Sequence, residues 1–169
     1  MDPVSPEEIR IGRQALTVLW ADLIRAEPHE GCALLLGLME GPSWTIRQIW
    51  PCSNVWEPVL ERHQRFAIDP REQLTAQRWG RQQGWRVLGS AHSHPFSAPV
   101  PSATDRQLAF GPTLMLILGL APEAERDGDP QVLLRQPGLS PERGLAAWWL
   151  AAEPEAQGAC RRLGWRMED

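Results

Sequence analysis

Apolar residues recur at the spacing of one helical face near the start of the chain. Ahead of them, Ser5 can cap a helix, Pro6 suits a first helical turn, and Glu8 stands three residues after the serine. The pattern predicts a helix from Ser5 to about Arg25. Its apolar face consists of Leu16, Leu19, Trp20, Leu23 and Ile24.

Several short apolar or alternating segments are typical of strands. The runs at 32–40 and 113–120 are almost wholly apolar, which is typical of strands buried on both faces. The tail from 153 to 169 fits either a last short strand around Trp165 or a disordered end. Further strands are expected at 44–50, 85–92, 131–135 and 145–151.

Two further helices are expected between the strands. Asp69, Pro70 and Glu72 repeat the helix-start pattern, and a short helix should begin near Ser102. Polar and proline-rich segments predict surface loops at 51–65 and 95–101.

Strands that alternate with helices predict an α/β fold, in which a mixed central sheet carries helices on its faces. The chain has 169 residues and shows neither an internal repeat nor a low-complexity linker. It is therefore expected to form one domain over residues 1–169, with a core at about 7–150 and an uncertain tail at 153–169.

The charge and the composition exclude several classes of protein. The formal net charge is −4 and all 17 basic residues are arginines, so there is no basic stripe for a nucleic acid and no lysine for Schiff-base chemistry. The longest apolar run, 112–122, is about half of a membrane span, and the acidic N-terminus is unlike a signal peptide. We expect a soluble protein without membrane or nucleic-acid partners.

The cysteines predict a reducing environment. Cys32, Cys52 and Cys160 are an odd number at wide spacing, which argues against a disulfide framework and a cysteine-rich zinc knuckle. A cytoplasmic location follows. Cys32 lies near Glu30 and is interpreted as a small buried residue rather than a redox-sensitive one.

The segment 92–105 gathers metal-binding residue types around a proline-broken loop. If the strand runs to His94, then His92 and His94 point to one face, with Cα atoms roughly 6–7 Å apart. Asp105, in the first turn of the next helix, could add a carboxylate. Two histidines and an aspartate suit one Zn²⁺ with water as the fourth ligand.

A simpler interpretation competes with the metal site at each position. A His-x-His pair is often a surface or core feature, and Ser102 with Asp105 also forms a capping box that needs no metal. Glu30, just before a buried strand, is the best candidate for the base that a hydrolytic zinc site needs, but by itself it could be a solvated loop residue. The joint occurrence of these residues favours the metal site.

These residues resemble a known motif. Glu30 ahead of an apolar strand, then H-x-H-P, then a loop ending in P-S-x-x-D, is similar to the JAMM motif of the MPN+ zinc metalloproteases. The resemblance extends over roughly 7–150 and is greatest to the short prokaryotic members. It implies a cytidine-deaminase-like α/β fold and cleavage of peptide or isopeptide bonds after the C-terminal Gly-Gly of ubiquitin-like or sulfur-carrier proteins.

The resemblance also implies a role for each site residue. His92, His94 and Asp105 would bind one zinc ion that carries a water molecule. Glu30 would be the general acid/base, and Ser102 would donate a hydrogen bond to the oxyanion of the tetrahedral intermediate.

Two departures and two rival functions remain. Ala33 stands where many bacterial members have glycine, and the chain lacks the insertions that confer ubiquitin-linkage specificity. The rivals are a catalytically silent MPN-type scaffold that binds proteins, and a nucleoside deaminase, whose P-C-x-x-C signature is absent. The sequence leaves the oligomeric state open, with a homodimer among the alternatives.

Overall fold

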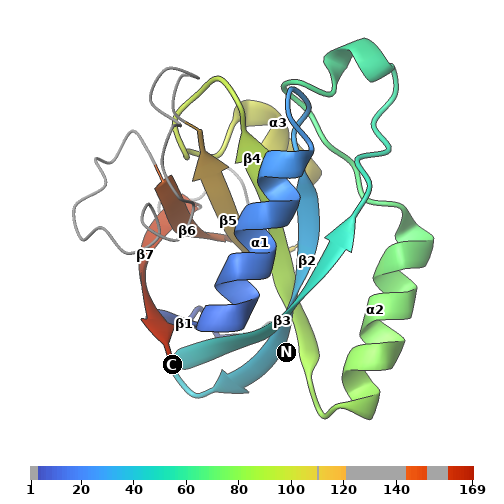
Figure 1. Cartoon of the computed structure of the whole chain (residues 1–169). Coiled ribbons are helices and arrows are strands. Elements are labelled where there is room, and N and C mark those ends of the chain that lie inside the picture. Colours follow the sequence, from blue (N-terminus) through green and yellow to red (C-terminus); the bar gives the residue numbers. More distant parts are fainter. Residues whose placement is uncertain (1–3, 110, 121–143, 152–159) are drawn as a thin grey trace.

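The structure is a computed structural model that describes residues 4–109, 111–120, 144–151 and 160–169 (Figure 1). Its elements follow the chain in this order: β1 (Glu8–Gly12), α1 (Arg13–Arg25), β2 (Cys32–Glu40), β3 (Ser43–Cys52), the 3₁₀ turn η1 (Val59–Glu61), α2 (Pro70–Gln82), β4 (Arg86–His94), α3 (Ala103–Leu108), β5 (Thr113–Gly119), β6 (Gly144–Leu150) and β7 (Cys160–Glu168).

The strands form one mixed sheet that closes on itself in the order β1-β3-β2-β4-β5-β6-β7. The pairs β1–β3, β1–β7 and β4–β5 are parallel, and the other neighbours are antiparallel. The predicted α/β class with a mixed sheet is confirmed. Its closure was not predicted, and the finer cytidine-deaminase-like arrangement stays a prediction.

The prediction of a helix from Ser5 is wrong, because residues Glu8–Gly12 form strand β1. Ile9 and Ile11 alternate with polar neighbours and are fully buried, which is a strand pattern of period two. Ser5 donates to the carbonyl of Pro6 and caps no helix. Helix α1 begins only at Arg13 and, as predicted, ends at Arg25.

Strand β7 continues the sheet beyond the predicted core. It is longer than the short strand expected around Trp165, and its residues Gly164–Glu168 pair in parallel with β1. The first and last strands of the chain, β1 and β7, are therefore neighbours in the sheet. The expected strand at 131–135 falls outside the described residues.

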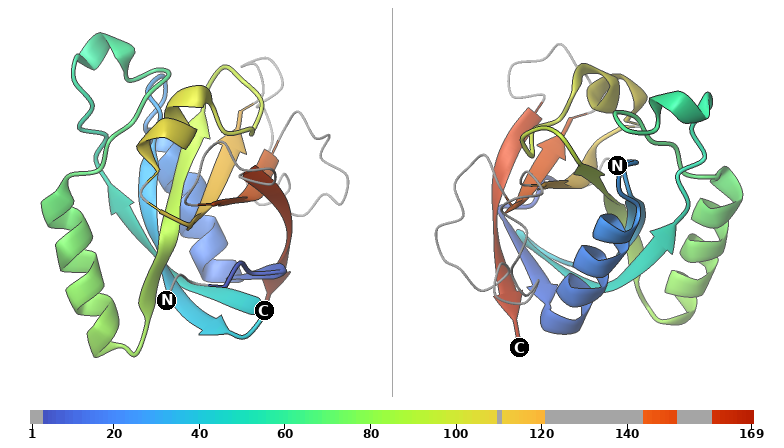
Figure 2. Two further views of the ribbon diagram at one scale, coloured as in Figure 1. Left: turned by 180° about the vertical axis from the view of Figure 1, so that it is seen from behind. Right: turned by 45° about the horizontal axis from the view of Figure 1, so that its top comes forward.

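Helix α1 lies on the inner side of the curled sheet (Figure 2). Its residues Leu16, Leu19 and Leu23 pack with inward-facing residues from all seven strands in one large core. Helix α2 covers the outer side, where Ala76 packs against Leu34 and Leu36 of β2. Strand β2 is thus buried on both faces, which explains its continuous apolar run.

The other predicted elements are confirmed with small changes at their ends. Asp69 caps α2 by accepting from the backbone N–H of Arg71 across 2.9 Å, and Ser102 caps α3. Strand β4 runs to His94 and lies between β2 and β5 in the sheet. None of the helices in the described ranges is long and apolar enough to span a membrane.

Candidate active site

The two histidines of the motif stand at the end of the central strand β4. Ala91 faces the inner core, so His92 and His94 face the outer side by alternation. His92 is fully buried and His94 nearly so. The strand stops at His94 because Pro95 offers no backbone N–H to continue the ladder.

Asp105 reaches the histidines from the first turn of α3. Its Oδ2 lies 3.1 Å from Nε2 of His92 and 3.3 Å from Nε2 of His94, and the two nitrogens are 3.0 Å apart. The loop that returns the chain to α3 is anchored where Trp148 Nε1 donates to the carbonyl of Pro99 across 2.9 Å. The structure thus brings together the three side chains that the sequence assigned to a metal.

The three atoms have the chemistry and spacing of a divalent metal site. Ligands placed about 2.0–2.1 Å from a tetrahedral zinc ion would be about 3.3 Å from one another. The separations of 3.0–3.3 Å are close to that value. The donor set of two imidazole nitrogens and one carboxylate oxygen matches the three protein ligands of a catalytic zinc site.

The tautomer of His94 suits metal binding. Its Nδ1 lies 2.8 Å from the carbonyl oxygen of Ala98, so this nitrogen must carry the proton that it donates. In the neutral ring Nε2 is then a free acceptor that faces His92 and Asp105. Metal-bound histidines are commonly oriented in this way by a bond at the other ring nitrogen.

Burial and charge move the pKa values of the three residues apart. Burial lowers the pKa of His92. Burial also lowers the pKa of His94, but hydrogen bonds with Asp105 and with the Ala98 carbonyl outweigh it and raise the pKa overall. Burial opposes ionisation of Asp105, yet hydrogen bonds with both histidines hold its pKa well below the usual range. The aspartate is therefore an anion, as a metal ligand must be.

Glu30 is a buried carboxyl beside this group. It precedes β2, is only 3% exposed, and its Oε2 has no hydrogen-bond partner among the described residues. Burial raises its pKa to about 8, with attraction to His94 opposing and repulsion from Asp105 reinforcing the change. A carboxyl of this kind can hold or release a proton near neutral pH.

Ser102 lies at the rim of the group and forms a capping box with Asp105. Its Oγ accepts from the backbone N–H of Asp105 across 3.0 Å, and its own N–H donates to Oδ2 of Asp105 across 2.8 Å. The hydroxyl acts only as an acceptor in these bonds. Its hydrogen remains available for a substrate oxygen.

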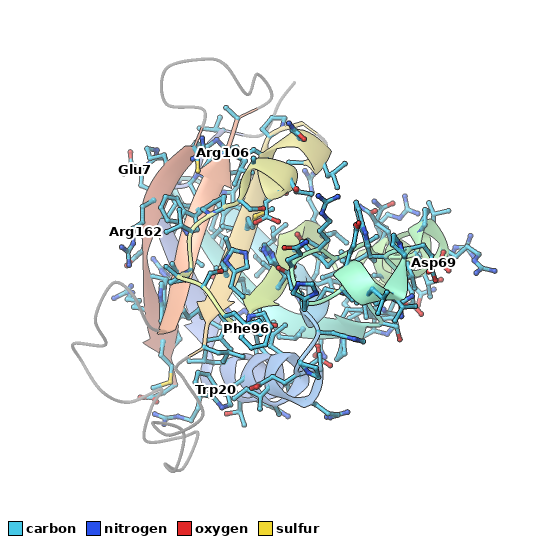
Figure 3. All side chains as sticks on the ribbon, turned by 90° about the horizontal axis from the view of Figure 1, so that it is seen from above. Glu7, Trp20, Asp69, Phe96, Arg106 and Arg162 are labelled. Atoms are coloured by element: carbon cyan, nitrogen blue, oxygen red, sulfur yellow. The ribbon has the colours of Figure 1, made fainter. Side chains whose placement is uncertain are left out.

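A cavity of about 490 Å³ opens beside Asp105 between α2, β4 and α3. Asp105 is the one charged residue among the described residues that line it. The polar part of its wall consists of Gln73, Gln77, Ser90, Thr104 and Thr113. In the view from above, Phe96 and Arg106 mark the loop after β4 and helix α3, which border the site (Figure 3).

Sequence reasoning missed three contacts of the site. Phe66 stacks on the His92 ring with centroids 4.4 Å apart, Ser93 Oγ accepts from the N–H of Gly31, and Asn54 bonds to the Glu30 carbonyl. No local pattern predicts contacts between residues so distant in the chain. Two signals were available in the sequence: the apolar residue Phe66 at the end of the 51–65 loop, and the polar residue Ser93 between the two histidines.

The remaining histidines and Cys32 are not members of the metal-ligand group among the described residues, although Cys32 lies opposite His92 in the sheet. His63 is exposed and bonds to the carbonyl of Leu60, while His29 is partly buried and is not among the grouped ligands. Cys32 is fully buried opposite Cys52 in the sheet, and burial raises the pKa of its thiol. This geometry fits the interpretation of Cys32 as a packing residue.

Known proteins are similar to this chain in sequence and in fold. A desampylase from Haloferax volcanii is 34% identical over 91 residues, covering 54% of this chain and 62% of that protein, so less than two thirds of that relative is matched. A solution structure of a protein from Desulfitobacterium hafniense is similar with a TM-score of 0.73 and 26% identity, covering 95% of this chain and 93% of that one. A solution structure of a protein from Salinibacter ruber (strain DSM 13855) is similar with a TM-score of 0.61 and 25% identity, covering 95% of this chain and 92% of that one.

A family match accounts for most of the chain. The family described as prokaryotic homologs of the JAB domain matches residues 12–131, which include Glu30, both β4 histidines and Asp105. The resemblance noted from the motif is thereby confirmed at the level of the family. The chain belongs to the prokaryotic homologs of the JAB domain.

Proposed function

We propose that this protein is a zinc-dependent hydrolase that cleaves the amide bond after the C-terminal Gly-Gly of a ubiquitin-like or sulfur-carrier protein. The carrying observation is the convergence of His92 Nε2, His94 Nε2 and Asp105 Oδ2 within 3.3 Å of one another beside a protonatable Glu30. The similar desampylase supports the substrate class, because its name denotes removal of the ubiquitin-like modifier Samp.

His92, His94 and Asp105 would hold the zinc ion. Bound there, zinc would supply a Lewis acid that activates a water molecule and polarises the scissile carbonyl. The low pKa of Asp105 and the Nδ1–H donation of His94 prepare both side chains for this role. Full burial of His92 limits competing solvent around the ligands.

Glu30 would act as the general acid/base. Its raised pKa, about 8 without metal, lets it take the proton of the attacking water and return it to the leaving amine. The positive charge of a bound ion would lower this pKa toward neutrality. Ser102, with its hydroxyl hydrogen uncommitted, would donate to the developing oxyanion.

The cavity beside Asp105 would receive the tail of the substrate. Its described lining is apolar or uncharged except for Asp105, which suits an extended, glycine-ending peptide better than a charged small molecule. The same chemistry serves peptide and isopeptide bonds, so the two classes differ only in the leaving amine. A sulfur-carrier protein extended beyond its Gly-Gly end is our preferred substrate.

The test pairs zinc content with cleavage. Purified protein should hold about one zinc per chain. His92→Ala should lose both metal and activity, whereas Glu30→Gln should keep the metal and lose cleavage of a Gly-Gly-extended carrier protein. His63→Ala is the matched control, because His63 is exposed and is not a member of the ligand group. It should behave as wild type.

Two outcomes would overturn the proposal. A protein that binds no zinc after reconstitution would leave the catalytically silent MPN-type scaffold as the better interpretation. Full activity of Glu30→Gln would remove the proposed general acid/base.

The proposed location is the reducing cytoplasm, with which the free thiols of Cys32, Cys52 and Cys160 are consistent. Light scattering on the purified protein would test for a homodimer.

A further inference from the structure

Asn54 is the single asparagine of the chain, and all of its hydrogen-bonding groups are used. It lies just beyond the end of β3. Its Nδ2 donates to the carbonyls of Glu30 and Arg65 across 3.0 and 2.9 Å, and its Oδ1 accepts from the N–H groups of Trp56 and Ala67 across 3.1 and 3.2 Å. Only an amide side chain offers two donors and an acceptor in this arrangement.

The first of these bonds acts on the backbone of Glu30. The N–H of Glu30 donates to the carbonyl of Arg62 across 2.7 Å, so the same loop holds this peptide on both sides. The next residue, Gly31, is tied to β4, where its N–H donates to Ser93 Oγ across 2.9 Å. Since Oε2 of Glu30 has no partner among the described residues, its carboxyl is aimed by the backbone and by packing.

The other bonds of Asn54 act on a metal-ligand candidate. Arg65 and Ala67, which accept from and donate to Asn54, flank Phe66 in the chain. The ring of Phe66 stacks on His92 with an interplanar angle of 22°. Asn54 therefore braces both the peptide that carries Glu30 and the aromatic ring that covers His92.

We propose that Asn54 is a positioning residue. It fixes the positions of Glu30 and of Phe66, whose ring covers His92, relative to the reaction centre. The inference rests on the proposed hydrolase function and adds a residue to it. Asn54 contacts neither metal ligands nor reacting atoms directly. Its effect should therefore fall on the rate of the chemical step and leave metal content and substrate binding in place.

The bonds can be tested first in the wild-type protein. Because Asn54 is the only asparagine, selective ¹⁵N-asparagine labelling gives one side-chain NH₂ pair in an NMR spectrum. Both hydrogens are bonded, so their exchange with solvent should be at least about tenfold slower than in a free asparagine amide. Exchange at the free rate would overturn the proposal before any variant is made.

Three variants then separate positioning from general loosening of the loop. Asn54→Ala removes the brace, and Asn54→Asp keeps its shape but turns lone pairs toward the carbonyls of Glu30 and Arg65. Glu61→Ala is the matched control, since it removes a bond from Trp56 Nε1 and an ion pair with Arg65 within the same loop, without touching Glu30.

Both Asn54 variants should keep about one zinc per chain and a KM within about twofold, while kcat falls by about 10–100-fold. Glu61→Ala should keep its kcat within about twofold. An equal kcat loss in Glu61→Ala, or a loss of zinc in either Asn54 variant, would show a merely structural role and overturn the proposal.

Failure of the proposed function is distinguishable from failure of this inference. If the wild-type protein cleaves nothing, the hydrolase function fails, and the brace is judged by exchange of the Gly31 amide alone, which should accelerate in Asn54→Ala. If the wild-type protein is active and Asn54→Asp is equally active, only the positioning role is lost.

Discussion

Asp105 and Ser102 exchange two hydrogen bonds, and through them the start of α3 holds the carboxylate that faces the two histidines. The same pair of bonds that caps the helix therefore orients a candidate metal ligand. The capping box and the metal site, which are alternative interpretations of the sequence, coexist in the structure.

Ser102→Gly and Ser102→Ala separate the two roles of this serine. As a helix cap, glycine costs only a few tenths of a kcal/mol, whereas alanine costs about 1 kcal/mol. Both variants lack the hydroxyl that would bind the oxyanion, so kcat should fall by about 100-fold or more in each. Urea unfolding measures the stability of the two variants, and steady-state kinetics measures their kcat. A kcat loss that is large in Ser102→Ala but small in Ser102→Gly would follow stability and contradict the oxyanion role.

Removing the metal should destabilise the protein. A ligand present at about 100 times its Kd adds about 2.7 kcal/mol, which corresponds to roughly 5–10 °C in Tm for a chain of this size. Excess EDTA should lower the Tm of the wild type and of His63→Ala by this amount. It should leave the Tm of His92→Ala unchanged, and a shift in that variant would place the metal elsewhere.

Glu30→Gln should stabilise the metal-free protein at high pH. Burial raises the pKa of Glu30 from 4.5 to about 8, so the folded chain binds more protons than the unfolded chain between these values. The free energy of unfolding therefore falls as pH rises through this window. The free energy of unfolding of the glutamine variant does not fall in this way. Relative to wild type, it should rise by roughly 2–4 kcal/mol as the pH goes from about 5 to about 8.

The measurement is urea unfolding of both proteins in EDTA at several pH values. His63→Ala serves again as the control and should follow the wild-type dependence. A difference between Glu30→Gln and wild type that does not change with pH would mean that Glu30 is not held protonated by burial.

Local signals in the sequence predicted the elements that present the site. The apolar run of β2, the cap of α2 at Asp69 and the His-x-His pair depend on neighbours in the chain, so the pattern of residues sufficed. The first strand was missed because Ser5, Pro6 and Glu8 imitate a helix start, and the alternation of Ile9 and Ile11 extends over too few residues to outweigh it.

Contacts between distant segments could not be predicted in the same way. Closure of the sheet depends on the pairing of Glu8 with Gly164 at opposite ends of the chain, and no local pattern encodes this register. The bond from Asn54 to Glu30 is similar, since it needs the loop and the start of β2 to meet in space. Such features need the assembled fold.

Gly31 should tolerate no side chain, because helix α1 passes too close. A Cβ there would lie 2.9 Å from Cα and 3.0 Å from the carbonyl oxygen of Leu23, and 3.1 Å from Cβ of Ala26. These atoms belong to the backbone or sit close to it and cannot turn away. Gly31→Ala should therefore destabilise the protein by about 1–3 kcal/mol and move the adjacent Glu30.

Gly164→Ala is the matched control for this substitution. Gly164 is exposed in β7, and a Cβ there meets nothing within 4 Å, so the change should be nearly neutral in urea unfolding. Because Gly31 links Glu30 to Ser93, Gly31→Ala should also lower kcat more than its loss of stability explains. Equal stability and activity of the two alanine variants would mean that α1 does not fix the position of Glu30.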